Sequence, residues 1–391
     1  HLFGGSVELT CLGLFGIQGG DALKAAIAPF AAANPDDRIV FAVQADYAIL
    51  HDLRTPTRQE LDQACPDRPF AMFAPDHHTI WANTAALELA GLLHGGETDA
   101  GSQIVMGDDG RATGELREPG AYAAILKLTR HGGRDMAGLV TGADPVPAPT
   151  RAEREKDKAA IARGMKHCAA QGITGLHCMD GNRYQLELLS EMEAEGTLLC
   201  RTAVPFHLKS YDSLDRLEQA DTMRRDFSGD MVWCNHVKMF IDGVVEGRTA
   251  HMLAPYPGTD DNYGDPVFEV DHFNEACRRI DAMGMQIAVH AIGDAGIRHT
   301  IDGYEAARKA NGARDSRHRI EHLEVMHPDD IPRLAELDIV ASIQPGHAPF
   351  GGIFPPAGSA STCTITRSKE PIRGTKYATA VPRSCSRPIG R

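Results

Sequence analysis

Three polar residues lie on or at the ends of successive apolar, β-rich runs in the second half of the chain. Lys238 lies inside one run, and His290 and His322 close the next two. A neutral imidazole is a natural ligand for Zn²⁺ and similar ions. A lysine inside an apolar strand is costly unless it is neutralised or paired, and carbamylation by CO2 would turn it into an anionic oxygen ligand. A single histidine at a strand end is usually an ordinary hydrogen-bonded residue, but the three together predict a metal centre.

Alternating strands and helices must position these side chains. From about residue 170 the alternation predicts an α/β fold with a parallel sheet, which either closes as a (β/α)8 barrel or stays open and doubly wound. No GxGxxG or P-loop follows a strand, and this disfavours the nucleotide-binding forms. A barrel carries its catalytic groups at the carboxyl ends of its strands. The expected strands are 173–179, 201–207, 236–241, 286–292, 318–325 and 339–344.

Helix signals separate these runs. Asp271 is expected to cap a helix whose apolar face begins at Phe273, and Asp294 is expected to open another that ends before Gly312. Thr150 and Glu153 form a capping-box pattern after a proline-rich linker.

Residues 38–150 do not follow this rhythm. We expect a strand at 38–46, a helix at 80–91 and a hairpin turn at 107–110. The whole segment is interpreted as an insertion subdomain. The expected division is 1–37 for the start of the barrel after strand 1, 38–150 for the insertion, 151–357 for barrel strands 2–7, and 358–391 for an aberrant or disordered tail.

The charge of the 391-residue chain is unevenly distributed. The net charge is −13, yet residues 361–391 carry seven Lys/Arg and one acidic residue, so the tail is +6 and the rest is −19. An acidic body disfavours nucleic acid and anionic membranes as partners, and no apolar run is long enough to span a bilayer. Nine cysteines without a CxxC pair indicate reduced thiols in a cytoplasmic protein.

Eight short segments, in order, give the chain a specific resemblance. The set resembles the amidohydrolase superfamily of metal-dependent hydrolases, and within it the amidohydrolase family 3 branch that includes N-substituted formamide deformylases. The segments are 1–5, 76–83, 114–118, 172–174, 237–243, 248–250, 289–294 and 317–322.

This resemblance implies a fold and a ligand set. The fold would be a (β/α)8 TIM-like barrel of the metal-dependent hydrolase type, with a β-sandwich built from both chain ends. By motif, His1 resembles the second histidine of the family's His-x-His pair. Lys238 resembles its carboxylated strand-4 lysine, and His290 and His322 resemble the ligands on strands 5 and 6. The expected strands listed above would then be strands 2 to 7.

The resemblance also implies substrate-binding residues. His78, Trp81 and Glu118 resemble residues that face the substrate, while Asp242 and Arg248 follow the lysine and would orient it or line the mouth of the site. Core packing is the alternative for Trp81, and a structural salt bridge is the alternative for Asp242 and Arg248. Two further residues are expected to act structurally: His318, and Glu321 on the barrel exterior.

Two parts of the family pattern do not occur in this sequence. The first histidine of the pair would precede residue 1, and no strand-8 Asp is visible, so no proton-handling catalytic residue is assigned. We interpret the chain as truncated at both ends, with an incomplete barrel, little of the sandwich, and a frameshift or other sequence error near residue 357. An ordinary disordered basic tail is the alternative.

The expected function is hydrolysis of a non-peptide C–N bond, of the amide or formamide type, by water activated on one or two divalent ions, with Zn²⁺ as the expected ion. Deamination and cyclic-amide hydrolysis are alternatives within the same superfamily. A non-catalytic or inactive fragment is the alternative outside enzymes. The expected partners are a small-molecule substrate and a second copy in a homodimer.

Overall fold

The computed structural model describes residues 2–50, 54–75, 77–98, 102–245 and 248–344. His1 and the tail 358–391 therefore lie outside the described residues. The chain forms two compact units: the first comprises residues 1–176 and 187–201, and the second comprises 177–186 and the chain from 202 onward.

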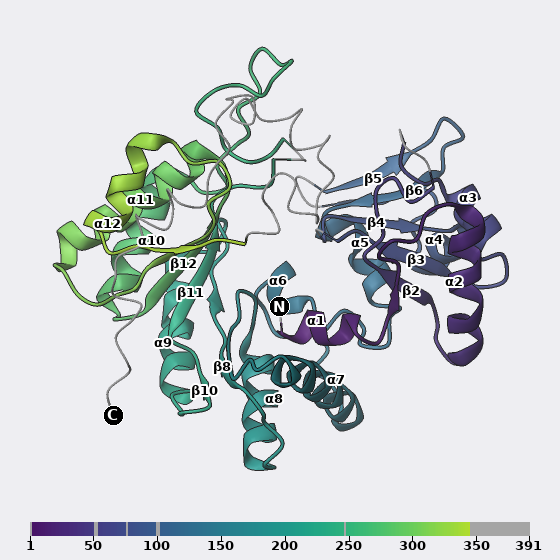
Figure 1. Cartoon of the computed structure of the whole chain (residues 1–391), viewed down its shortest axis with the longest axis horizontal. Coiled ribbons are helices and arrows are strands. Elements are labelled where there is room, and N and C mark those ends of the chain that lie inside the picture. Colours follow the sequence, from purple (N-terminus) through teal and green to yellow (C-terminus); the bar gives the residue numbers. More distant parts are fainter. Residues whose placement is uncertain (1, 51–53, 76, 99–101, 246–247, 345–391) are drawn as a thin grey trace. The chain divides into compact units, whose positions relative to one another are not determined.

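The second unit is built on parallel strands. Five of them pair in the order β14-β13-β12-β11-β9, and helices alternate with the strands along the chain (Figure 1). All six expected strand runs contain strands, although 201–207 is divided in two. The alternation is confirmed, whereas closure into a barrel stays a prediction. The strands are β7 (Gly175–His177), β8 (Arg201–Ala203), β9 (Phe206–His207), β10 (Val232–Trp233), β11 (His236–Phe240), β12 (Gln286–Ala291), β13 (Arg319–His322) and β14 (Val340–Ser342).

Helices of the second unit cover one face of this sheet. The apolar residues that alternate along β11, β12 and β13 are fully buried, and α10 and α11 both contact β12. Figure 1 shows α10, α11 and α12 gathered on that side. The helices are η1 (Leu214–Arg216), α9 (Leu217–Asp226), α10 (Val270–Ala282), α11 (Asp294–Asn311), η2 (Pro328–Asp330) and α12 (Ile331–Glu336).

The ends of these helices follow from local sequence. Helix α10 buries the expected apolar face from Phe273 to Ile280, but its N-cap is Glu269 and Asp271 lies in the first turn. The acidic Asp271 still stabilises that turn through the helix dipole. Helix α11 begins at Asp294 as expected and is capped at its end by Gly312, whose φ is 86°.

Strand register places the polar residues on the other face. Phe240 pairs with His290, and His290 pairs with Glu321, so the three side chains share one face, and Lys238, two residues before Phe240, shares it too. The expectation that Glu321 faces the barrel exterior is therefore wrong. The expectation assumed that Glu321 and its neighbour His322 point to opposite faces of the strand. This assumption fails because His322 leaves the regular strand conformation with a φ of 81°.

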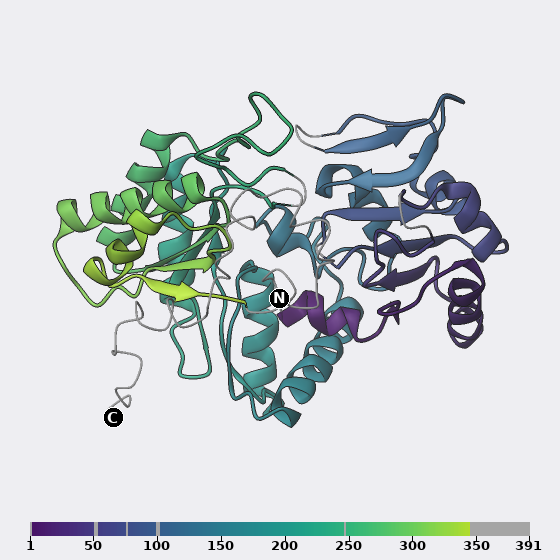
Figure 2. The same ribbon diagram turned by 45° about the horizontal axis from the view of Figure 1, so that its top comes forward.

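The first unit contains a mixed six-stranded sheet of order β1-β2-β3-β4-β6-β5, whose strands lie side by side in Figure 2. The pairs β1/β2 and β2/β3 are parallel, and the remaining pairs are antiparallel. The strands are β1 (Leu12–Gly13), β2 (Val40–Val43), β3 (Phe70–Phe73), β4 (Thr79–Ala82), β5 (Gln103–Met106) and β6 (Ala112–Arg117).

Eight helices start within residues 2–183 of the described chain. Helix α7 begins with the expected capping box of Thr150 and Glu153. The helices are α1 (Leu2–Glu8), α2 (Gly20–Ala33), α3 (Arg58–Ala64), α4 (Thr84–Ala90), α5 (Pro119–Leu126), α6 (Ala137–Val140), α7 (Arg151–Ala170) and α8 (Arg183–Ala194).

One expectation for this unit needs correction. The segment 80–91 is not one helix, because Asn83 accepts hydrogen bonds from the backbone N–H groups of Ala86 and Phe70. The Asn83 side chain thereby ends strand β4 and caps helix α4. In addition, β1 pairs with β2, so Leu12 and Gly13 belong to the same sheet as strands of the segment 38–150, and the division of the chain at residue 37 stays a prediction.

Candidate metal centre

Lys238 lies in the middle of β11 and is 2% exposed. Its Nζ donates to the backbone oxygen of Met239 at 2.8 Å and lies 3.4 Å from the centroid of the Phe240 ring. Burial drives the pKa of Lys238 well below its ordinary range; Glu321 opposes this shift and Lys209 adds to it. Burial therefore favours the neutral form of the amine.

His290 and His322 lie side by side at the carboxyl ends of β12 and β13. Their ring centroids are 4.7 Å apart, in an edge-to-face arrangement. The positive φ values of His322 (81°) and Leu323 (54°) break the strand alternation and let the His322 ring reach the His290 ring. The histidine side chains at the ends of two adjacent strands are therefore in contact.

One nitrogen of each ring contacts an oxygen acceptor. His290 Nε2 donates to the backbone oxygen of Gly243 at 2.9 Å, and His322 Nδ1 contacts Gln344 Oε1 at 2.9 Å. In a neutral imidazole, such an acceptor selects the tautomer with hydrogen on that nitrogen and the lone pair on the other. Metal-ligating histidines are usually oriented in this way.

The donor set fits a metal, but the described residues supply only part of it. Within them, no group of three or more His, Cys, Asp or Glu side chains forms a metal cluster. Two imidazoles and one buried lysine are present, and the expected fourth ligand, His1, lies outside the described residues. Imidazole nitrogen and carboxylated lysine oxygen are both suitable donors for Zn²⁺.

Two residues near Lys238 and Phe240 were not identified from the sequence, namely His207 and Lys209. His207 pairs with Lys238 in the register of β9 and β11, and its ring lies 5.4 Å from that of Phe240. Lys209 Nζ lies 5.8 Å from the Phe240 centroid, and burial lowers its pKa to about 8. Alternate residues of a strand share one face, so continuing the expected strand 201–207 would place residues 207 and 209 on the same face. This alternation was the sequence signal that could have identified them.

A partly buried polar cluster centred on Arg319 shares the face of Lys238. Arg319 forms an ion pair with Glu321, donates to Ser342 Oγ at 2.8 Å, and contacts His177 Nδ1 at 3.1 Å. These contacts join β7, β13 and β14 through one guanidinium. The interior of a (β/α)8 barrel is usually filled by branched apolar side chains, so a charged cluster on this face would be unusual in the predicted barrel.

Asp242 and Arg248 differ in their surroundings. Asp242 is 3% exposed, and its carboxylate accepts three backbone hydrogen bonds, from His251, Ile292 and Gly293. Burial raises the pKa of Asp242 to about 7, while these donors act to lower it. Arg248 is exposed, with a φ of 55°.

The three other expected substrate residues belong to the first unit. His78 Nδ1 contacts both carboxylate oxygens of Glu118, at 2.9 and 3.1 Å, and both side chains are partly exposed. Trp81 is fully buried in the core of this unit, and its ring packs edge-on against Tyr47. Trp81 therefore packs in the core, as the core-packing alternative expects, and its role in substrate binding stays a prediction.

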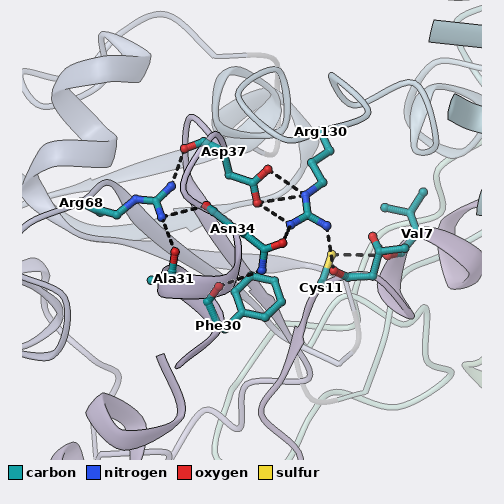
Figure 3. Close-up of polar contacts among 9 residues, drawn as sticks. Val7, Cys11, Phe30, Ala31, Asn34, Asp37, Arg68 and Arg130 are labelled. Atoms are coloured by element: carbon teal, nitrogen blue, oxygen red, sulfur yellow. Dashed lines mark hydrogen bonds and ion pairs between the residues drawn. The ribbon is translucent and has the colours of Figure 1, made fainter. Parts of the chain in front are cut away.

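A second polar cluster in the first unit is structural (Figure 3). Arg130 pairs with Asp37, and Arg68 donates to the backbone oxygens of Ala31 and Asn34 at the end of α2, where helix carbonyls lack partners. The adjoining cavity of about 30 Å³ has room for roughly one water. Burial raises the pKa of the Cys11 thiol there to about 12, so it is a poor nucleophile.

The chain is similar to known proteins. The chain is 29% identical over 292 residues to the putative amidohydrolase YtcJ of Bacillus subtilis, covering 74% of this chain and 50% of the relative. It is 26% identical over 312 residues to the N-substituted formamide deformylase of Arthrobacter pascens, covering 77% and 52%. The chain thus spans about half the length of these curated relatives.

A solved structure supports the fold. An uncharacterized metal-dependent hydrolase from Pyrococcus horikoshii superimposes with a TM-score of 0.62 at 23% identity, over 88% of this chain and 61% of that one. No helix among the described residues is long and apolar enough to cross a membrane. The model of the amidohydrolase family matches residues 1–372, and the chain belongs to this family.

Proposed function

We propose that this chain is part of a metal-dependent hydrolase that cleaves a non-peptide C–N bond of the amide or formamide type. The observation that carries the proposal is the contact of His290 and His322 at the ends of adjacent parallel strands, together with the buried Lys238 on the sheet face that His290 shares. Family membership supports a metal-dependent hydrolase, and the formamide deformylase among the relatives supports the bond type.

The residues at the strand ends would bind the metal. His290, His322, carboxylated Lys238 and His1 would hold one or two divalent ions. A bound Zn²⁺ would supply hydroxide at neutral pH and polarise the carbonyl oxygen. The neutral amine of Lys238 is the form that can take up CO2, because a protonated amine has no lone pair.

The protein's other residues would shape and orient the site. The ring of Phe240 lies over Lys238 Nζ and would shield the lysine from water. The hydrogen bonds to Gly243 and Gln344 would keep the two imidazole rings in their ligating orientation. His78, Glu118 and Arg248 would bind the substrate, a small molecule; their polar side chains suit an amide group.

Metal analysis with a substrate panel tests the proposal. The purified protein is loaded with Zn²⁺ and bicarbonate and assayed with N-substituted formamides, cyclic amides and aminated bases. We expect about one or two equivalents of Zn²⁺ and formamide hydrolysis. The variants His290→Asn and His322→Asn should lose both. Activity on cyclic amides or aminated bases alone would overturn the bond assignment, and absence of metal uptake would overturn the metal site.

A further inference from the structure

The carboxylate of Asp242 joins three segments of the second unit. Asp242 lies two residues after the end of β11. Its Oδ1 accepts the N–H of Ile292 at 3.0 Å, and its Oδ2 accepts those of Gly293 at 2.8 Å and His251 at 3.0 Å. These donors come from the end of β12, the N-cap of α11, and the long segment between β11 and α10. A single buried side chain therefore holds the ends of both strands against that segment.

The surroundings of this carboxylate leave no space for displacement. A Cβ atom at Gly296 would lie 2.6 Å from Asp242 Oδ2, and one at Gly293 would lie 2.1 Å from the backbone oxygen of His251. The N–H groups of Ala295 and Gly296 both donate to that same oxygen at 3.1 Å. The first turn of α11 is therefore closed around His251, and its dipole favours the nearby negative charge.

This arrangement extends to the candidate metal centre through one backbone carbonyl. Gly243, the residue after Asp242, accepts the hydrogen bond from His290 Nε2 at 2.9 Å, and that nitrogen lies 3.7 Å from Asp242 Oδ1. A Cβ atom at Gly243 would lie 2.1 Å from Thr249 Oγ1, so the carbonyl is closely confined. The orientation of the His290 ring thus depends on where Asp242 holds the chain.

We propose that Asp242 is a positioning residue that acts through Gly243 on His290, and that it does not contact the substrate. The hydrogen bonds from His251, Ile292 and Gly293 fix the Gly243 carbonyl, and this carbonyl fixes the tautomer and orientation of the His290 ring. The consequence for metal affinity rests on the proposed function; the consequence for ring orientation does not.

Asp294 provides a matched control. It is also buried at the start of α11, and its Oδ1 accepts the N–H of Leu253 at 2.7 Å from the same segment. Its hydrogen bond goes to Leu253 and not to His290. Asp242→Asn and Asp294→Asn each replace a buried carboxylate by an amide of equal size. Asp242 accepts three N–H groups and Asp294 accepts one, so the first change costs more stability, but only the first alters the support of His290.

The first arm uses metal-free protein. Hydrogen exchange and ¹⁵N NMR of histidine report on the amides and on the His290 tautomer. Asp242→Asn should speed exchange of the His251 and Gly293 amides by at least about tenfold and mix the His290 tautomers. Asp294→Asn should affect the Leu253 amide and leave the His290 spectrum unchanged. An unchanged His290 spectrum in folded Asp242→Asn would overturn the proposal.

The second arm titrates the protein with Zn²⁺ alone. Asp242→Asn should weaken the affinity by about 10- to 100-fold, and Asp294→Asn by less than about threefold. If the unmodified protein takes up no Zn²⁺, the proposed function fails while the first arm still decides the role of Asp242.

Gly296→Ala serves if Asp242→Asn does not fold, because it displaces the same carboxylate without removing a charge. Its expected effects have the same direction and are smaller. An unchanged His290 tautomer in folded Gly296→Ala would then count against the proposal.

Discussion

Strand β13 is flanked by two histidines with different surroundings. At the amino end, His318 Nδ1 accepts the N–H of Ile287 at 3.0 Å, and its Nε2 donates to Asp281 at 3.1 Å. Asp281 also accepts from Arg314 at 2.6 Å and from Asn311 at 2.9 Å. Burial lowers the pKa of His318, so its ring is neutral, with one nitrogen donating and the other accepting. The ring nitrogens of His318 and the carboxylate of Asp281 are therefore hydrogen-bonded to other protein groups within this cluster.

The carboxyl end of the same sheet is arranged differently. His322 contacts His290 through its ring edge, and each ring uses one nitrogen for an oxygen acceptor. Lys238 donates to a backbone oxygen, and within the described residues no carboxylate lies at ion-pair distance from it. One end of the sheet thus uses its polar groups for hydrogen bonds within a buried cluster, whereas the other end carries the residue types that we propose hold a metal.

The largest expected effect comes from Lys238→Met. The change removes a proposed ligand, so Zn²⁺ uptake should be lost and hydrolysis should fall by at least about 1000-fold. The free energy of unfolding should stay constant or rise by about 1 kcal/mol, because a buried amine is replaced by an apolar chain of similar length. Elemental analysis and urea unfolding measure the two quantities.

Lys158→Met is the control for that variant. Lys158 is also buried, but its Nζ lies 2.5 Å from Glu195 and 3.1 Å from Glu155. Its loss should lower stability and leave Zn²⁺ uptake unchanged. A Lys238→Met protein that unfolds as readily as Lys158→Met and still binds Zn²⁺ would contradict the functional assignment of the carboxyl end.

A smaller effect is expected at the amino end. Although burial alone would raise the pKa of Asp281, hydrogen bonds from His318, Asn311 and Arg314 lower it to about 2. Because the folded-state pKa lies below the ordinary value of 3.8, the carboxylate stabilises the fold above about pH 4, and this contribution is lost between about pH 4 and pH 2. Its size is about 2 kcal/mol.

Asp281→Asn should therefore lower stability at pH 7 by about 2 kcal/mol and flatten the pH dependence between about pH 4 and pH 2. Zn²⁺ uptake by the folded protein should be unchanged. Urea unfolding at a series of pH values measures this, with the exposed Asp315→Asn as the comparison. If Asp281→Asn lowered Zn²⁺ uptake while the protein stayed folded, the two ends of the sheet would not be separate in role.

The smallest expected effect is that of Gly296→Ala. Alanine favours a helix by about 1 kcal/mol over glycine, but the new Cβ would crowd Asp242 at 2.6 Å. We expect a net loss of about 1 kcal/mol. Gly5→Ala in α1 meets no atom within 4 Å and should stabilise instead. Equal stabilisation by both changes, measured by urea unfolding, would show that the carboxylate is not tightly enclosed.

Local patterns were sufficient to find most of the elements. The apolar runs predicted every strand from β7 to β14 except the short β10, and the pairing of Thr150 with Glu153 predicted the start of α7. These signals depend on neighbours a few residues apart, which a sequence displays directly. The helix expected at 80–91 failed because Thr79–Ala82 is buried on both faces of a sheet, and such a run has no alternating pattern to identify it as a strand.

The residue types of the site could be predicted from the sequence, whereas the hydrogen-bond partners of those residues could not. The motif 317–322 contains both His318 and His322, and the sequence alone indicated which chemistry histidine, lysine and aspartate can perform. The tertiary structure decided that His318 is held by Asp281, 37 residues away, and that His322 turns toward His290 through a positive φ. It also decided that Glu321 faces Lys238 and that Trp81 is core. The physical reason is that a side chain's role depends on burial and on hydrogen-bond partners, which come from segments distant in sequence and are brought together only by the register of the strands.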